Sequence, residues 1–124
     1  MAFDYKKECK ELYQPKKTPS IIDVPPANYV AVRGTGNPNV EGGAYQHAMQ
    51  LLYGISFTIK MSPKSGWDIA GYFPDVVPPL EGFWKQVGSN GAFDLSRKDE
   101  FEWMSCIRLP EFVTLDVFEQ AKSI

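Results

Sequence analysis

The order of local patterns along the chain predicts an α+β fold, an antiparallel sheet with a helix packed on one face. Helical and extended patterns follow one another as helix, strand, helix, a run of strands, and a closing helix. The clearest helical pattern lies at residues 44–55, and the clearest alternating patterns lie at 57–61 and 101–107. A length of 124 residues predicts a single domain over residues 1–124.

The first elements are a surface helix and a short strand. Residues 4–14 form a helix candidate, with Asp4 as a possible N-cap and Pro15 ending it. Residues 29–33 predict a strand that ends in the turn-forming segment 34–39. Two glycines of that segment hint at a phosphate-binding turn, but the third glycine is missing, so a simple turn is the preferred interpretation.

The central helix is predicted from apolar residues at three- and four-residue spacing. They are Ala44, Tyr45, Ala48, Leu51, Leu52 and Ile55. Gly54 is the expected C-terminal stop. Phe57, Ile59 and Met61 then alternate with polar residues, which predicts a half-buried strand entered directly from the helix.

The second half of the chain predicts strands and one closing helix. Residues 69–73 and 76–84 read as extended, and the prolines at 78 and 79 place the second segment at a sheet edge or make it irregular. A turn signal at 88–91 precedes the expected strand at 101–107, which Pro110 ends. Thr114 is the expected cap of a helix from Leu115 to about Lys122.

Composition and charge exclude several classes of function. The net charge is −2 and the isoelectric point is near 5.4, so no basic surface is expected to attract nucleic acid. No signal peptide or membrane span is found, and Cys9 and Cys106 are expected to be reduced thiols, which together predict a cytoplasmic protein. Two cysteines and one histidine do not supply a zinc site, and no cofactor is expected.

The segment 78–84 is the best candidate for a functional site. Along a strand, Leu80, Gly82 and Trp84 point to one face, and Glu81 and Phe83 to the other. A carboxylate among aromatic rings suits a small-molecule site, with glycine allowing close approach to the backbone. An ordinary strand with a solvent-facing glutamate explains the same residues.

Motifs along nearly the whole chain resemble the GyrI-like small-molecule-binding family. They are Phe3 to Glu8, Glu11-Leu-Tyr13 with Pro15, Val24-Pro25, Gly34-x-Gly36-Asn-Pro38-Asn39, Tyr45-x-x-Ala48, Leu52-Tyr53-Gly54-Ile-Ser56, Phe57 to Met61, Pro79-Leu-Glu81-Gly82-Phe-Trp84, and Trp103-x-x-x-Ile107 followed by Pro110 to Thr114. The resemblance implies a fold shared with the SOUL haem-binding superfamily, in which two strand-helix-strand-strand repeats enclose a ligand cleft. Members include drug-sensing domains, a DNA gyrase inhibitor, and hydrolases that open cyclopropanes of DNA-alkylating natural products.

This chain resembles only the first repeat of the larger members. The resemblance therefore implies half of a SOUL/GyrI-like fold, and a homodimer in which two copies replace the two repeats. In many larger members the key cleft glutamate belongs to the second repeat, so Glu81 takes its place only by repeat symmetry.

The resulting hypothesis is a multidrug-type cleft that binds a small hydrophobic or cationic molecule. The expected ligand-binding residues are Tyr45, Tyr53, Trp67, Tyr72, Glu81, Phe83, Trp84 and Trp103. The alternative is a hydrolase acting on a cyclopropane-type electrophile, with Glu81 as general base and Tyr53 or Tyr72 donating a hydrogen bond. Many of these aromatics are equally explained as core residues, and His47 is expected to be exposed rather than a haem ligand.

Overall fold

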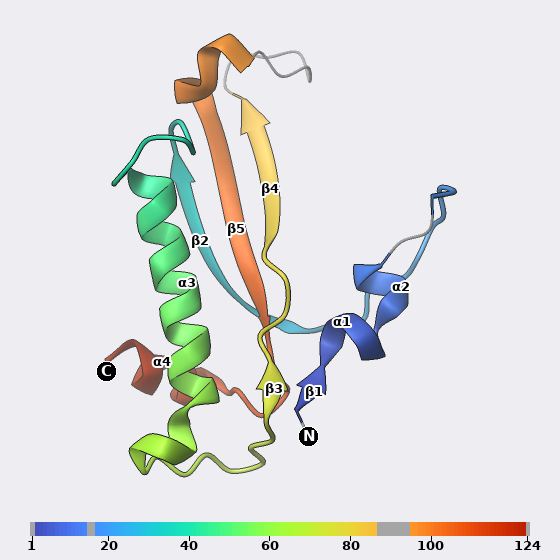
Figure 1. Ribbon diagram of the computed structural model, residues 1–124, viewed down its shortest axis with the longest axis vertical. Helices are drawn as coiled ribbons and strands as arrows, with labels where there is room; N and C mark the ends of the chain where they lie inside the picture. The colour runs from blue at the N-terminus through green and yellow to red at the C-terminus, as the bar shows by residue number, and fades with distance from the viewer. Residues whose placement is uncertain (1, 15–16, 87–94, 124) are drawn as a thin grey trace.

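The computed structural model describes residues 2–14, 17–86 and 95–123. Its centre is a three-stranded antiparallel sheet of order β2-β5-β4, formed by β2 (Asn28–Thr35), β5 (Phe101–Leu109) and β4 (Glu81–Gln86). The long helix α3 (Ala44–Lys60) runs along one face of this sheet (Figure 1). The predicted α+β class is therefore confirmed.

The central strand β5 carries the apolar core of the sheet. Val30 of β2 lies opposite Ile107 of β5, and both side chains are buried. Leu52 and Ile59 of α3 pack into the same cluster. Burying these side chains stabilises the fold by about 1.5–3 kcal/mol each, because apolar surface leaves water.

The predicted helix at 4–14 is divided in two. After β1 (Phe3–Asp4), α1 (Tyr5–Glu8) and α2 (Lys10–Tyr13) are separated by Cys9, whose backbone is non-helical at φ −119° and ψ 54°. Asp4 does cap α1, since its carboxylate accepts from the Lys6 amide at 3.0 Å. Strand β1 pairs in parallel with β3 (Asp75–Val76) and fixes this segment beside the sheet.

The predicted break at Gly54 and the predicted strand at 57–61 are wrong. Helix α3 continues to Lys60, followed by the 3₁₀ helix η1 (Ser62–Ser65). Leu52, Ser56 and Ile59 are buried at helical spacing, so Ile59 continues the inward stripe of the helix rather than starting a period of two. Gly54 is exposed and lies inside the helix, which tolerates glycine at a cost of about 1 kcal/mol relative to alanine.

The second half matches the expectation in part. Residues 69–73 do not form a strand, and the segment expected at 76–84 is divided into β3 and β4, with Pro78 and Pro79 between them. Strand β4 is an edge strand, as the prolines indicated. The turn expected at 88–91 lies outside the described residues. The 3₁₀ helix η2 (Leu95–Glu100) leads into β5.

The last helix forms as predicted. Helix α4 (Leu115–Lys122) begins after Thr114, whose hydroxyl oxygen accepts from the Val117 amide at 3.3 Å. Its Ala121 is buried against the core, and Val117 and Phe118 pack there partly buried. Within the described part of the chain, no helix is both long and apolar enough to cross a membrane.

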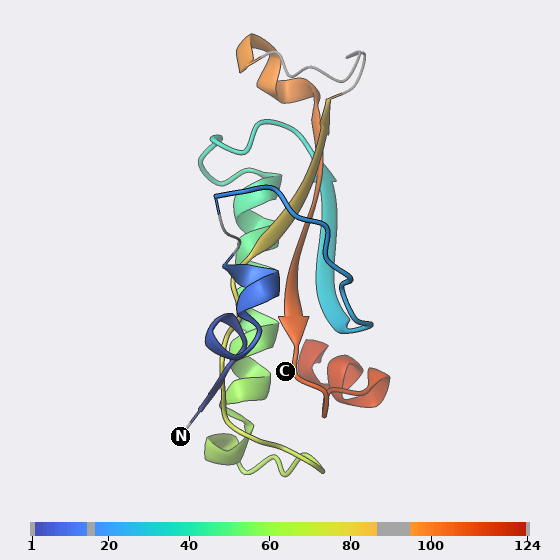
Figure 2. The same cartoon turned by 90° about the vertical axis from the view of Figure 1, so that its right-hand side faces the viewer.

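The two faces of the sheet differ in which helices pack on them. Figure 2 shows α3 on one side of the strands, whereas no helix of the described residues lies over the upper half of the other side. We call this second side the open face. Because residues paired across antiparallel strands share a face, the register assigns every second residue of β2, β5 and β4 to the open face.

Candidate ligand-binding site

The candidate strand β4 presents different chemistry to the two sides of the sheet. Glu81, Phe83 and Lys85 point to the open face, and Gly82 and Trp84 point to the side of α3. This alternation is the one predicted from the sequence. The expected aromatic cleft around Glu81 is therefore divided by the sheet itself.

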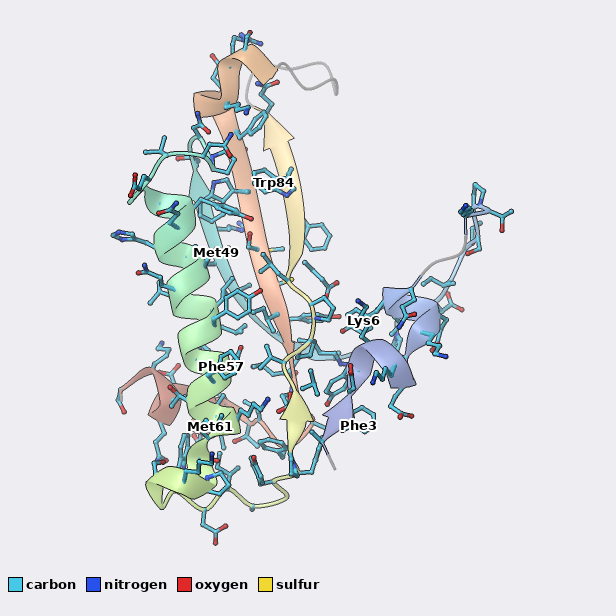
Figure 3. All side chains as sticks on the ribbon, viewed as in Figure 1. Phe3, Lys6, Met49, Phe57, Met61 and Trp84 are labelled. Atoms are coloured by element: carbon cyan, nitrogen blue, oxygen red, sulfur yellow. The ribbon has the colours of Figure 1, made fainter. Side chains whose placement is uncertain are left out.

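On the α3 side, three of the expected aromatic residues form a cluster. The ring of Tyr45 lies 5.4 Å from that of Trp84 and 5.1 Å from that of Trp103. Trp103 is 4% exposed, so it is a core residue. Figure 3 shows Trp84 on β4, with Met49, Phe57 and Met61 along α3.

Gly82 has a packing role in this cluster. A Cβ atom at Gly82 would lie 2.8 Å from the indole Nε1 of Trp84, which folds back over the strand. The close approach to the backbone that the sequence suggested for a ligand is made by Trp84.

Tyr53, Trp67 and Tyr72 lie away from Glu81. Tyr53 belongs to α3, on the opposite side of the sheet. The Tyr72 hydroxyl donates to the Lys60 carbonyl at 2.6 Å, and Trp67 packs partly buried against the core. The hydrogen-bonding role expected for Tyr53 or Tyr72 beside Glu81 does not fit these positions.

The open face contains a groove of about 530 Å³. We call it the sheet groove. It is lined by Arg33, Gly34, Thr35, Phe83, Trp84, Lys85, Glu102, Trp103 and Met104. Phe83, Met104 and Arg33 form one row across the three strands, and Phe83 is 61% exposed. An apolar ring left open to water in a groove favours binding of a flat apolar group.

Glu81 lies on the open face next to the sheet groove, outside the residues that line it. It is the next open-face residue of β4 after Phe83, about 7 Å along the strand, and it lies opposite Cys106. Its Oε2 atom is buried and has no hydrogen-bond partner among the described residues. Burial raises the pKa of the Glu81 carboxyl, and the nearby Arg108 guanidinium lowers it in part.

Two tyrosines that the sequence analysis did not select experience the charge of Glu81. Burial, and then the Glu81 charge, raise the pKa values of Tyr13 and Tyr29. Tyr13 comes from α2, and Tyr29 from the open face of β2. A hydroxyl donor near Glu81 is therefore available, but from residues other than those expected.

Arg108 is a candidate site residue that the sequence analysis missed. It is 8% exposed in β5, between the buried Ile107 and Leu109. The sequence does contain a signal for this residue, since an arginine inside an apolar strand is unusual. Arg108 is also two residues from Cys106 and therefore points to the same face of the sheet.

Metal binding has no structural support in the described residues, where no group of three or more His, Cys, Asp or Glu side chains could hold a metal ion. Cys9 and Cys106 are free thiols, as expected. His47 is exposed, also as expected.

Among the solved structures that this chain resembles are three from Listeria innocua. An uncharacterized conserved protein is 47% identical, with a TM-score of 0.85, over 98% of this chain and 57% of its own. Two hydrolases match at 47% and 44% identity, with TM-scores of 0.87 and 0.82. No protein-family model and no curated protein matches the chain.

The matches also show how much of a larger fold is present. They cover almost all of this chain but only 57–58% of the solved chains. The chain therefore spans just over half the length of these proteins, in agreement with the expectation of half a fold.

Proposed function

We propose that this chain is a GyrI-like protein that binds lipophilic or aromatic small molecules in the sheet groove, with Glu81 as a polar contact next to it. The observation that carries the proposal is the half-buried Glu81 carboxylate, unpartnered at Oε2 and next in line to the exposed Phe83 ring. A ligand ring stacks on Phe83 and Met104, and a cationic or hydrogen-bond-donating group satisfies Oε2.

The same proposal includes a homodimer in the cytoplasm. The sheet groove is shallow and apolar at its centre, and the chain spans just over half the length of the solved relatives. A second copy, related by a twofold axis, encloses the ligand between two open faces. Light scattering on the eluting protein is expected to give twice the mass of the chain, and a monomer that binds ligand fully contradicts this part.

Fluorescence titration tests the role of Glu81. The probes are rhodamine 6G, a lipophilic cation, and N-phenyl-1-naphthylamine, a neutral aromatic. Glu81→Gln is expected to weaken rhodamine 6G binding about 10- to 150-fold, because a charge-assisted contact is worth roughly 1.5–3 kcal/mol, and to leave the neutral probe unchanged.

A matched control separates this effect from a loss of net charge. Glu119→Gln changes an exposed glutamate of α4 that pairs with Lys122 at 3.3 Å, far from the groove in the fold. It is expected to bind both probes like the parent protein. Equal affinity of parent and Glu81→Gln for rhodamine 6G contradicts the proposed contact.

A second candidate function is hydrolysis, which the two hydrolases among the solved relatives favour. In this proposal Glu81 removes a proton from water as the water oxygen bonds to a strained-ring carbon of the substrate. The ring C–C bond breaks, its electron pair moves to a conjugated carbonyl oxygen, and that oxygen takes up a proton. The net change is addition of one water molecule.

Turnover distinguishes the two candidates. A spirocyclopropyl cyclohexadienone in ¹⁸O-labelled water is expected to give a labelled alcohol with the parent protein. With Glu81→Gln the rate is expected to fall about 10²–10⁴-fold, since general-base catalysis contributes that much. If the parent protein binds the dienone but does not convert it, hydrolysis of this compound class is excluded and the binding function is retained.

A further inference from the structure

Arg108 is a buried cation on the same face of the sheet as the candidate carboxylate. Glu81 lies opposite Cys106, and Arg108 is the next open-face residue along β5. Diagonal neighbours on one face of an antiparallel pair are about 7–8 Å apart at their backbones, within reach of two long side chains. Arg108 is therefore placed to interact with Glu81 beside the sheet groove.

The guanidinium is fixed from several sides. Its Cζ lies 4.6 Å from the centre of the Tyr5 ring, and its Nη2 donates to Glu111 Oε1 at 3.4 Å. Tyr13 of α2 also interacts electrostatically with it. The Tyr5 hydroxyl donates to the other oxygen of Glu111 at 2.7 Å, so Glu111 is held as well. This arrangement prevents the charge from turning away into solvent.

The other titratable groups that experience the charge of Glu81 are neutral near pH 7. They are Tyr13, Tyr29 and the Cys106 thiol, and burial raises the pKa of each above its usual value. Among the interactions described for Glu81, Arg108 is the one positive charge. Two carboxylates, Glu81 and Glu111, therefore share one guanidinium.

We propose that Arg108 is a positioning residue that keeps Glu81 ionised in its half-buried site, and that Glu111 limits how much of the Arg108 charge Glu81 experiences. This inference assigns a regulator to the site proposed above and rests on that proposal only for its effect on ligand binding. Through Tyr5 and Tyr13, the same network attaches α1 and α2 beside Glu81, next to the groove.

Removal of Arg108 and removal of the Glu111 charge are predicted to change the pKa of Glu81 in opposite directions. Removing Arg108 takes a cation from Glu81 and raises its pKa, whereas removing the Glu111 charge frees Arg108 for Glu81 and lowers that pKa. A network with only a structural role has no reason to move the Glu81 titration in opposite directions.

The test is a ¹³C NMR titration of the Glu81 carboxyl in the full chain without ligand. Arg108→Gln is expected to move the midpoint to higher pH, Glu111→Gln to lower pH, and Arg108→Lys to stay closer to the parent. Glu119→Gln is the control and is expected to leave the midpoint unchanged. Midpoints that stay unchanged, or that move together in Arg108→Gln and Glu111→Gln, overturn the inference.

A fold defect in one variant does not block the test. If Arg108→Gln does not fold, Glu111→Gln and Arg108→Lys still decide it, because Glu111 has an exposed side chain and the lysine variant keeps the charge. Rhodamine 6G binding, measured against pH, is expected to follow each midpoint. Shifted midpoints with unchanged probe binding support the Arg108 role and contradict the proposed function, so the two failures are distinguishable.

Discussion

Trp103 lies directly over Gly34 on the α3 side of the sheet. A Cβ atom at Gly34 would come within 2.5 Å of two carbon atoms of the indole ring. The two residues are partners in the β2–β5 register, so the absence of a side chain at Gly34 gives the buried indole its position. Tyr45, and through it Trp84, packs against this ring.

Gly34→Ala is predicted to destabilise the protein by about 1–3 kcal/mol, because the ring of Trp103 must move in a packed core. In a strand, alanine is otherwise no worse than glycine, so a loss of stability identifies the contact with the ring. Urea unfolding followed by tryptophan fluorescence measures it. A neutral or stabilising result would mean that Trp103 does not occupy this position.

Gly54→Ala is the matched substitution in α3. No atom lies within 4 Å of a Cβ built at Gly54, and the residue is inside a continuous helix. Alanine is therefore expected to stabilise the protein by about 0.5–1 kcal/mol, and the same urea experiment checks this. A loss of stability would instead agree with the helix stop that the sequence suggested.

Thr114→Ala is predicted to cost about 1 kcal/mol. The substitution removes the oxygen that accepts from the Val117 amide at the start of α4. Thr114→Ser keeps this acceptor and is expected to stay within a few tenths of a kcal/mol of the parent in thermal unfolding. Similar losses in both variants would show that the methyl group, rather than the cap, is responsible.

Stability is predicted to fall in acid partly through Glu111. Burial alone raises the pKa of this carboxyl, but the hydrogen bond from Tyr5, backbone hydrogen bonding and Arg108 together outweigh it, so the pKa is lowered from 4.5. A carboxyl whose pKa is lower in the folded protein than in the unfolded chain stabilises the fold at pH values above its unfolded pKa. This stabilisation is lost as the pH falls through the folded pKa. Chemical unfolding between pH 3 and 6 is expected to show a smaller acid loss in Glu111→Gln than in the parent. Equal losses of stability in acid for the parent and Glu111→Gln contradict this role of Glu111.

The sequence predicted elements whose signals are local. The Thr114 cap and Pro110 define the end of β5 and the start of α4, and both form as expected. The error at Gly54 arose because Phe57, Ile59 and Met61 fit a period of two over a short window. Only the burial of Ser56 and Ile59, a tertiary effect, identifies the segment as helix.

The candidate site was predicted less completely because it depends on strand register. Alternation correctly separated Glu81 from Trp84, but only pairing with β5 shows that Arg108 shares the face of Glu81. Tyr13 reaches this site from a distant part of the chain, through the parallel pairing of β1 and β3. Neither relationship leaves a periodic pattern in the sequence.

The methionines allow the most direct test of the claim that ligands bind on the open face. Met104 lines the sheet groove, whereas Met49 in α3 and Met61 directly after it lie on the other side of the sheet (Figure 3). With ¹³C-methyl methionine, titration with N-phenyl-1-naphthylamine is expected to shift the Met104 signal and leave those of Met49 and Met61 in place. Shifts of Met49 or Met61 with an unchanged Met104 would contradict the account and move the site to the α3 side.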